Sequence, residues 1–154
     1  MRKEGDEKLN TYTVKGQMDE DDGAVRIPLN DGNFKTGYRV LAFAVAPSSL
    51  NDSSAVGVTG KLMTEDNGQA STSWDWGDNR EIAWAEYTHM WNVSGDYTNG
   101  QTGFVDPDNL IVDDLFIRVN HQTEGLVNYM ITMERMSIDE WQAALAMVRN
   151  RSQA

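Results

Sequence analysis

The segment IVDDLFIRVNHQTEGLVNYMITMER, residues 111–135, decides the fold class of this chain. It contains two runs, residues 111–119 and 126–135, in which apolar and polar side chains alternate with the period of two that half-buried strands show. Residues 120–125 between them are typical of a turn. The pattern predicts two antiparallel strands joined as a hairpin, each with one face on an apolar core.

Upstream, five further stretches are rich in β-branched and aromatic residues and are bounded by polar turns. These stretches are residues 11–17, 24–29, 38–46, 55–64 and 81–91. Pro28 lacks an N–H donor, so its strand is expected at a sheet edge. The run 38–46 is apolar on both faces, which predicts a central strand covered on both sides. Residues 81–91 also fit a helix with a capping pair at its start, but their density of aromatic residues favours a strand.

One helix, residues 138–150, is expected to end the chain. Ser137 and Glu140 have the spacing of a capping box. A single apolar stripe follows, made of Ile138, Trp141, Leu145 and Val148. A lone helix of this length is marginal in water, so the stripe must be buried. The short link to the strand 126–135 predicts burial on the sandwich of its own subunit; burial on a neighbouring copy is the alternative.

Together these elements predict an all-β fold, a two-layer β-sandwich of jelly-roll or related Greek-key topology with one C-terminal helix. Residues 11–154 are expected to form a single domain. Residues 1–10 are polar and charged and are expected to be a flexible arm. Residues 92–109, rich in Gly, Asp, Asn and Thr, are expected to form a long loop of the kind that is often functional.

The composition excludes several classes of function. The 154 residues include no cysteine, which rules out disulfides, a thiolate nucleophile and Cys-based metal sites. The formal net charge of −11 predicts no direct binding to nucleic acid or to an anionic membrane. No secretory signal is visible at the N-terminus, and no apolar run is long enough to span a bilayer.

The residue types that carry chemistry do not form a recognisable catalytic pattern, and we expect no enzyme. His89 and His121 belong to no Asp–His–Ser order and to no His-x-x-x-His pair. Acidic clusters lie at residues 19–22, at Asp106 and Asp108, and at Asp113 and Asp114. Calcium takes oxygen ligands from such clusters and is the one cofactor that they would suit, but turn formation is the commoner use of Asp in loops.

The tryptophans remain as candidates for binding. In an extended chain, Trp74 and Trp76 would present two indoles on one side, a platform that could stack on sugar rings. This is the basis of an alternative function, a carbohydrate-binding β-sandwich module. Trp84 and Trp91, like Trp141 in the helix, are expected to fill the core or a subunit interface, where tryptophan is enriched.

Two pieces of the chain resemble proteins of a known kind: NREIAWA, residues 79–85, and VNYMITMERMSIDEWQAALAMVRNRSQ, residues 127–153. They are similar to small uncharacterised proteins encoded by environmental marine viruses. The resemblance implies a virion structural role, such as a coat or capsid subunit that is made in the host cytoplasm and assembles with copies of itself. It carries over no functional residue. The mixed charges of residues 1–10 argue against direct contact with the genome.

Overall fold

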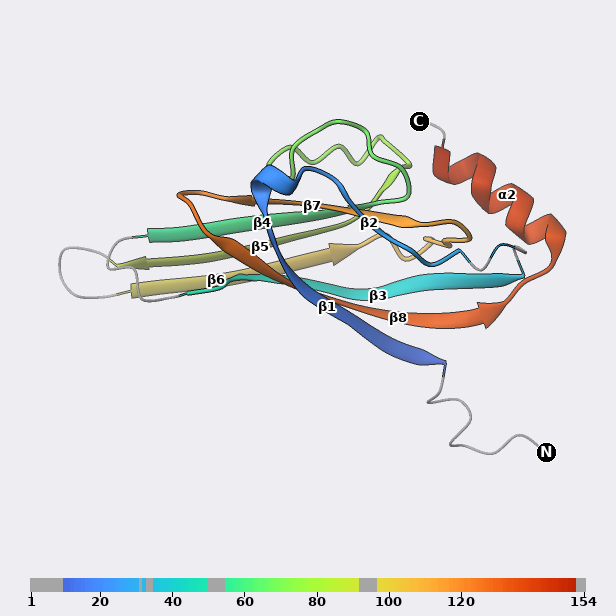
Figure 1. Ribbon diagram of the computed structural model, residues 1–154, viewed down its shortest axis with the longest axis horizontal. Coiled ribbons are helices and arrows are strands. Elements are labelled where there is room, and N and C mark those ends of the chain that lie inside the picture. Colours follow the sequence, from blue (N-terminus) through green and yellow to red (C-terminus); the bar gives the residue numbers. More distant parts are fainter. Residues whose placement is uncertain (1–9, 31, 33–34, 50–54, 92–96, 152–154) are drawn as a thin grey trace.

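The computed structural model describes residues 10–30, 32, 35–49, 55–91 and 97–151. Within them, two antiparallel sheets pack face to face, and one α-helix follows the last strand (Figure 1). This confirms the predicted all-β sandwich with a C-terminal helix. Apart from Asn10, the predicted flexible arm lies outside the described residues.

The described residues contain eight strands in two sheets. The three-stranded sheet has the order β1 (Thr11–Asp19), β8 (Leu126–Ser137), β3 (Thr36–Pro47). The five-stranded sheet has the order β2 (Val25–Ile27), β7 (Leu115–His121), β4 (Ala55–Met63), β5 (Glu81–Trp91), β6 (Tyr97–Val105). The 3-10 helix η1 (Glu20–Asp22) precedes β2, and α2 (Glu140–Arg151) follows β8.

The strand pairing is that of a jelly-roll relative, in which an eight-stranded ribbon is folded in half. The first strand pairs with the eighth, the second with the seventh and the fourth with the fifth. The exception is β6, which pairs with β5 and lies beside the edge of β3 without joining its sheet. The observed order therefore agrees with the predicted jelly-roll or related topology.

The apolar core lies between the two sheets and receives side chains from both. Leu62 and Ile117 enter it from the five-stranded sheet, and Ile131 and Met133 from the three-stranded sheet; all four are fully buried. Along β7, buried and half-buried residues alternate without a break, as the sequence pattern predicts. The strand predicted for residues 81–91 is confirmed as β5, and β2 lies at a sheet edge, as expected from Pro28.

The predicted hairpin of residues 111–135 is wrong in its pairing, although both strands exist. β7 pairs with β2 and β4, whereas β8 pairs with β1 and β3, so the turn between them carries the chain from one sheet to the other. Both strands bury one face in the same core from opposite sides. Each strand therefore shows the same alternation that the two strands of a hairpin would show. Alternation alone cannot identify the strand with which β7 or β8 pairs.

Two further expectations about strands are wrong. β3 is an edge strand of the three-stranded sheet, and its outward residues Leu41 and Ala42 are exposed. Although both faces of β3 are apolar, the described residues cover only one of them. The predicted loop 92–109 contains the strand β6, whose backbone pairs with β5. An edge strand with one solvent-facing side tolerates the polar and glycine residues that suggested a loop.

The helix α2 begins two residues later than predicted. Ser137 still belongs to β8, and the cap is Asp139, whose Oδ1 accepts the backbone N–H of Gln142 at 2.7 Å. In return, the Asp139 N–H donates to Oε1 of Gln142 at 3.1 Å. The capping box is therefore Asp139–Gln142 rather than Ser137–Glu140.

The face through which α2 docks is opposite to the predicted one. Ala143, Ala146 and Asn150 are buried, and the alanines pack with Val112. Of the predicted stripe only Ile138, which precedes the helix, is half-buried against this cluster. The other members of the stripe point away from the sandwich: Trp141 is 72% exposed, Leu145 54% and Val148 72%. The predicted burial of these three side chains on their own subunit is thus wrong.

The reason lies in the size of the docked side chains and in one polar anchor. Alanines let the helix backbone approach the sandwich closely. Asn150 Nδ2 donates to the carbonyl of Leu110 at 2.6 Å, and the Thr64 hydroxyl donates to the Asn150 carbonyl at 2.6 Å. These bonds satisfy polar groups at the end of the helix that would otherwise be buried without partners.

Candidate functional site

The first candidate site lies on the outer face of the five-stranded sheet, under the loop of residues 64–80 that joins β4 to β5. The register places Lys61, Trp84 and Phe104 side by side across β4, β5 and β6. Their sequence neighbours in β4 and β5 belong to the core, so these three side chains face outward. Lys61 and Trp84 are nevertheless buried, whereas Phe104 is 46% exposed.

A buried ion pair holds this loop to the sheet. Lys61 Nζ donates to Glu81 Oε2 at 2.9 Å, and both side chains are fully buried. The same ammonium donates to the carbonyls of Ala70 at 3.2 Å and Ser73 at 3.0 Å. All three donors of the lysine are therefore used, which is the condition under which a buried charge is tolerated.

The Glu81 carboxylate is equally well satisfied. It accepts hydrogen bonds from Asn67 Nδ2 at 2.7 Å, from the Asp75 backbone N–H at 2.9 Å and from Trp84 Nε1 at 2.8 Å. Burial alone would raise the pKa of this group, but the hydrogen bonds outweigh it and lower the pKa of Glu81. The carboxylate is therefore ionised at neutral pH and connects the loop, β4 and β5.

Two further ion pairs secure the loop near its ends. Arg118 on β7 holds the Asp66 carboxylate through two bonds, of 2.7 and 2.8 Å. Arg80 binds Asp78 from Nη2 at 2.8 Å, and these hydrogen bonds lower the pKa of Asp78 to about 2. A loop of this length with so many internal bonds presents its side chains in a fixed arrangement.

The two loop tryptophans alternate with the anchored residues. The Ser73 carbonyl accepts a hydrogen bond from Lys61, and the Asp75 N–H donates one to Glu81. The residues between and after them, Trp74 and Trp76, each place their ring against Phe104. Their ring centroids lie 6.2 and 5.9 Å from that of Phe104, with interplanar angles of 77° and 69°. We call Trp74, Trp76 and Phe104 the aromatic cluster. Trp76 also contacts the Trp84 ring beneath it, at 5.7 Å.

The aromatic cluster differs from the flat pair of indoles that the sequence suggested. Trp74 and Trp76 lie on a loop and not on a strand, and their rings stand steeply to the third ring, Phe104. Sequence reasoning missed Phe104, because it belongs to β6, a strand hidden in a polar stretch. Only the β5–β6 register brings this residue to Trp84.

A shallow depression of about 470 Å³ adjoins the aromatic cluster. It is lined by Thr59, Thr72, Trp74 and Glu86. The Glu86 carboxylate makes no hydrogen bond or ion pair within the described part of the chain. Hydroxyl groups and an unengaged carboxylate beside aromatic rings are suited to bind a ligand that has both hydroxyls and an apolar face.

The second candidate site is the exposed face of α2, which we call the helix face and define as Trp141, Leu145 and Val148. They follow i, i+4 and i+7 spacing on the side opposite the docked residues. Two arginines close to this face are bound within the same chain. Arg149 Nη1 donates to the Asp108 carbonyl at 2.6 Å, and Arg151 Nη2 to Asp113 at 2.8 Å.

The other predicted site residues serve the fold or lie outside the description. Trp84 is buried between the sheet and the loop 64–80, and the side chain of Trp91 lies outside the described residues. Asp19 and Asp22 form the cap of η1, and the other acidic clusters pair with arginines. Among the described residues, no group of three or more His, Cys, Asp or Glu side chains is placed to hold a metal ion.

Comparisons with known proteins add no relative. No family model, no curated protein and no solved structure matches the chain. In the part of the chain that the structure describes, no helix has the length and apolar character needed to cross a membrane. The protein is therefore defined by its fold and its surfaces: a jelly-roll-related sandwich with an aromatic cluster and an apolar helix face.

Proposed function

We propose that this protein is a self-assembling structural subunit whose copies associate through the helix face. The observation that carries the proposal is the exposure of three large apolar side chains on one side of α2, Trp141 foremost. A contiguous apolar surface marks an interaction site. Anchors at i, i+4 and i+7 are how an amphipathic helix enters a partner's groove, and tryptophan is frequent among the residues that dominate binding energy.

The kind of assembly is proposed from the resemblance. Jelly-roll architecture occurs both in viral shells and in sugar-binding lectins, so the fold alone does not choose between them. The segment 127–153, which resembles viral structural proteins, includes all of α2. We therefore propose a coat or capsid subunit that resides in the virion. The proposal assigns it no catalytic activity, no cofactor and, given the net charge of −11, no contact with the genome.

Two tryptophan variants test the proposal. Wild-type protein should form assemblies of many copies, visible by electron microscopy and light scattering. Trp141→Asp should give a monomer, because burying a carboxylate of the helix face in an apolar contact is costly. Its circular dichroism spectrum should match that of wild type, since the exposed side chain contributes little to the fold of the monomer. Trp76→Asp is the matched control, because Trp76 is 66% exposed but lies outside the helix face.

The outcomes are distinct. Assembly by Trp76→Asp and not by Trp141→Asp supports the proposal. A wild-type protein that stays monomeric at every concentration contradicts it, as does a Trp141→Asp variant that assembles like wild type.

A carbohydrate-binding module is the second candidate, and the aromatic cluster favours it. Aromatic faces can stack on the apolar face of a sugar ring, while Glu86 accepts hydrogen bonds from its hydroxyls. On a glycan array, Trp76→Asp should then lose the binding that wild type shows, and Trp141→Asp should keep it. Wild-type protein that binds no glycan would remove this candidate.

A further inference from the structure

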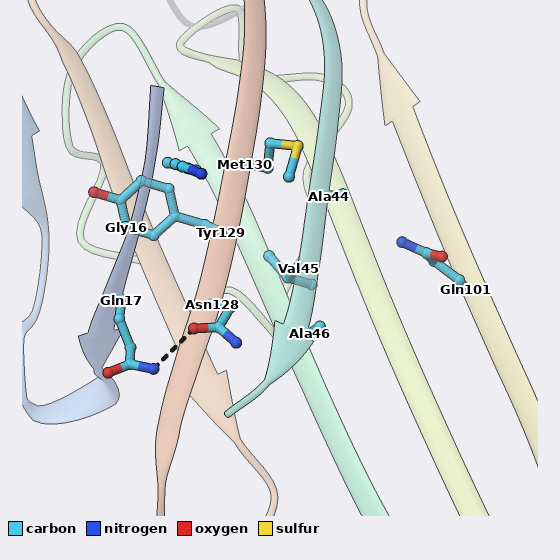
Figure 2. Close-up of a pocket in the computed structure, with 10 residues that line it drawn as sticks. Gly16, Gln17, Ala44, Val45, Ala46, Gln101, Asn128, Tyr129 and Met130 are labelled. Atoms are coloured by element: carbon cyan, nitrogen blue, oxygen red, sulfur yellow. Dashed lines mark hydrogen bonds between the residues drawn. The ribbon is translucent and has the colours of Figure 1, made fainter. Parts of the chain in front are cut away.

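We infer that the helix face of one copy inserts into an alanine-lined depression on the outer face of the three-stranded sheet of the next copy. The inference rests on the proposed function and adds to it the surface that receives the helix. The depression, whose lining residues Figure 2 shows, has a volume of about 680 Å³. Its lining residues come from β1, β3, β8 and β6: Lys15, Gly16, Gln17, Ala44, Val45, Ala46, Gln101, Asn128, Tyr129 and Met130.

Strand alternation explains why this surface is hollow. Val45 and Ile131 face the core, so Ala44, Ala46 and Met130 face outward. The register places Ala44 beside Met130. The alanines leave room that larger side chains on an exposed sheet would fill. Met130 is 49% exposed and can adjust to an incoming ring, because its side chain is flexible and polarisable.

The outer face of β3 is apolar, and we expect a further layer of protein to cover it. The sequence of β3 is apolar on both faces, but the core covers only one of them within the described chain. On the other face Leu41 is exposed, as are Leu126 and Met130 on the neighbouring β8. A second copy of the chain would supply the missing layer.

The distribution of charge favours a second copy at this place. Copies of a chain with a net charge of −11 repel one another, and contact is easiest where carboxylates are absent. None of the ten residues that line the depression is acidic, and Lys15 is the only charged one. The helix face also lacks a carboxylate, and Glu140, at the start of α2, has the opposite charge to Lys15.

A subunit cannot fill its own depression. α2 follows the C-terminal end of β8, and Met130 lies seven residues before Ser137, roughly 23 Å away at ~3.3 Å per residue. The helix lies beside that end of the sandwich (Figure 1), where Asn150 and Arg151 bind it to its own chain. The contact is therefore between copies and joins two different surfaces, so that association is head-to-tail and continues until a ring or shell closes.

Mixing two variants tests the contact. Ala44→Arg fills the depression and leaves the helix face intact. Trp141→Asp disrupts the helix face and leaves the depression intact. Each variant alone should be monomeric. An equimolar mixture should form dimers that cannot grow, because only one depression and one helix face remain complementary. Mass photometry would show species of two chains. Thr102→Arg, an exposed position on β6 outside the depression, is the control and should assemble like wild type.

Each failure has its own signature. If Ala44→Arg assembles like wild type while Trp141→Asp does not, the helix face mediates assembly but the receiving surface is wrong. If the mixture of two monomeric variants yields no dimer, the receiving surface is likewise wrong. If Trp141→Asp itself assembles, the proposed function fails together with this inference. Met130→Glu, at an exposed side chain, replaces Ala44→Arg should that variant not fold.

Discussion

At the scale of single residues, the buried Glu81 side chain fixes the position of the loop that carries Trp74 and Trp76. Its carboxylate binds Lys61, Asn67, the Asp75 backbone and Trp84 at once. Asp75 lies between Trp74, which is half-buried, and Trp76, which is exposed. The orientation of Trp74 and Trp76 on the surface therefore depends on a group that has no contact with solvent.

Replacing Glu81 with Gln should lower the free energy of unfolding by about 3–5 kcal/mol, because it leaves the Lys61 ammonium buried without its counter-charge. Urea denaturation measures the change, and tryptophan fluorescence should report the loosened loop. Glu86→Gln makes the same chemical change on the same strand at a half-buried carboxylate and should shift stability by less than ~0.5 kcal/mol. Equal stabilities for the two variants would show that the ion pair is not needed to hold the loop.

At the scale of elements, the approach of β6 to β3 depends on a glycine. A Cβ atom built on Gly103 would lie 2.8 Å from the carbonyl oxygen of Phe43, closer than such contacts allow. The opposing atom belongs to the backbone and cannot rotate away. Gly103 thus lets the five-stranded sheet close against the edge of the three-stranded one.

We expect Gly103→Ala to destabilise the protein by about 1–3 kcal/mol, the usual range for overpacking, because one strand must shift. Thermal unfolding followed by circular dichroism measures this. Thr102→Ala, at the neighbouring outward-facing position, should leave the melting temperature near that of wild type. A Gly103→Ala variant as stable as wild type would mean that β6 and β3 separate without cost.

At the scale of the whole molecule, charge and assembly oppose each other. A net charge of −11 keeps copies apart, while the inferred contact is apolar and free of carboxylates. Raising the ionic strength from about 0.01 M to about 1 M shortens the Debye length from ~30 Å to ~3 Å. Repulsion between copies should therefore weaken and the apolar contact should persist.

Light scattering of wild-type protein should accordingly show more assembly at high salt. Trp141→Asp should remain monomeric at both ends of the range, which separates the effect from nonspecific aggregation. A decrease of assembly with salt would contradict an apolar contact, because it would indicate subunits held by ion pairs.

The sequence alone determined the local properties of this protein. Alternation identified the strand at residues 126–135, the density of aromatic residues identified the strand at residues 81–91, and the predicted sandwich with a terminal helix is present. These features follow from the order of neighbouring side chains, which sets the period and hence the type of element. The edge strand β6 escaped detection because polar and glycine residues make up most of its sequence, and side-chain patterns do not encode its backbone pairing with β5.

The tertiary structure decided which surfaces meet. Both β7 and β8 have one apolar face, and only the assembled sandwich places them in opposite sheets. Likewise α2 has two faces that could be buried, and close packing of Ala143 and Ala146 left the large apolar face outside. Phe104 became part of the aromatic cluster only through the β5–β6 register. Partners far apart in the chain are chosen by shape and by hydrogen bonds that form only on folding, and no local pattern encodes that choice.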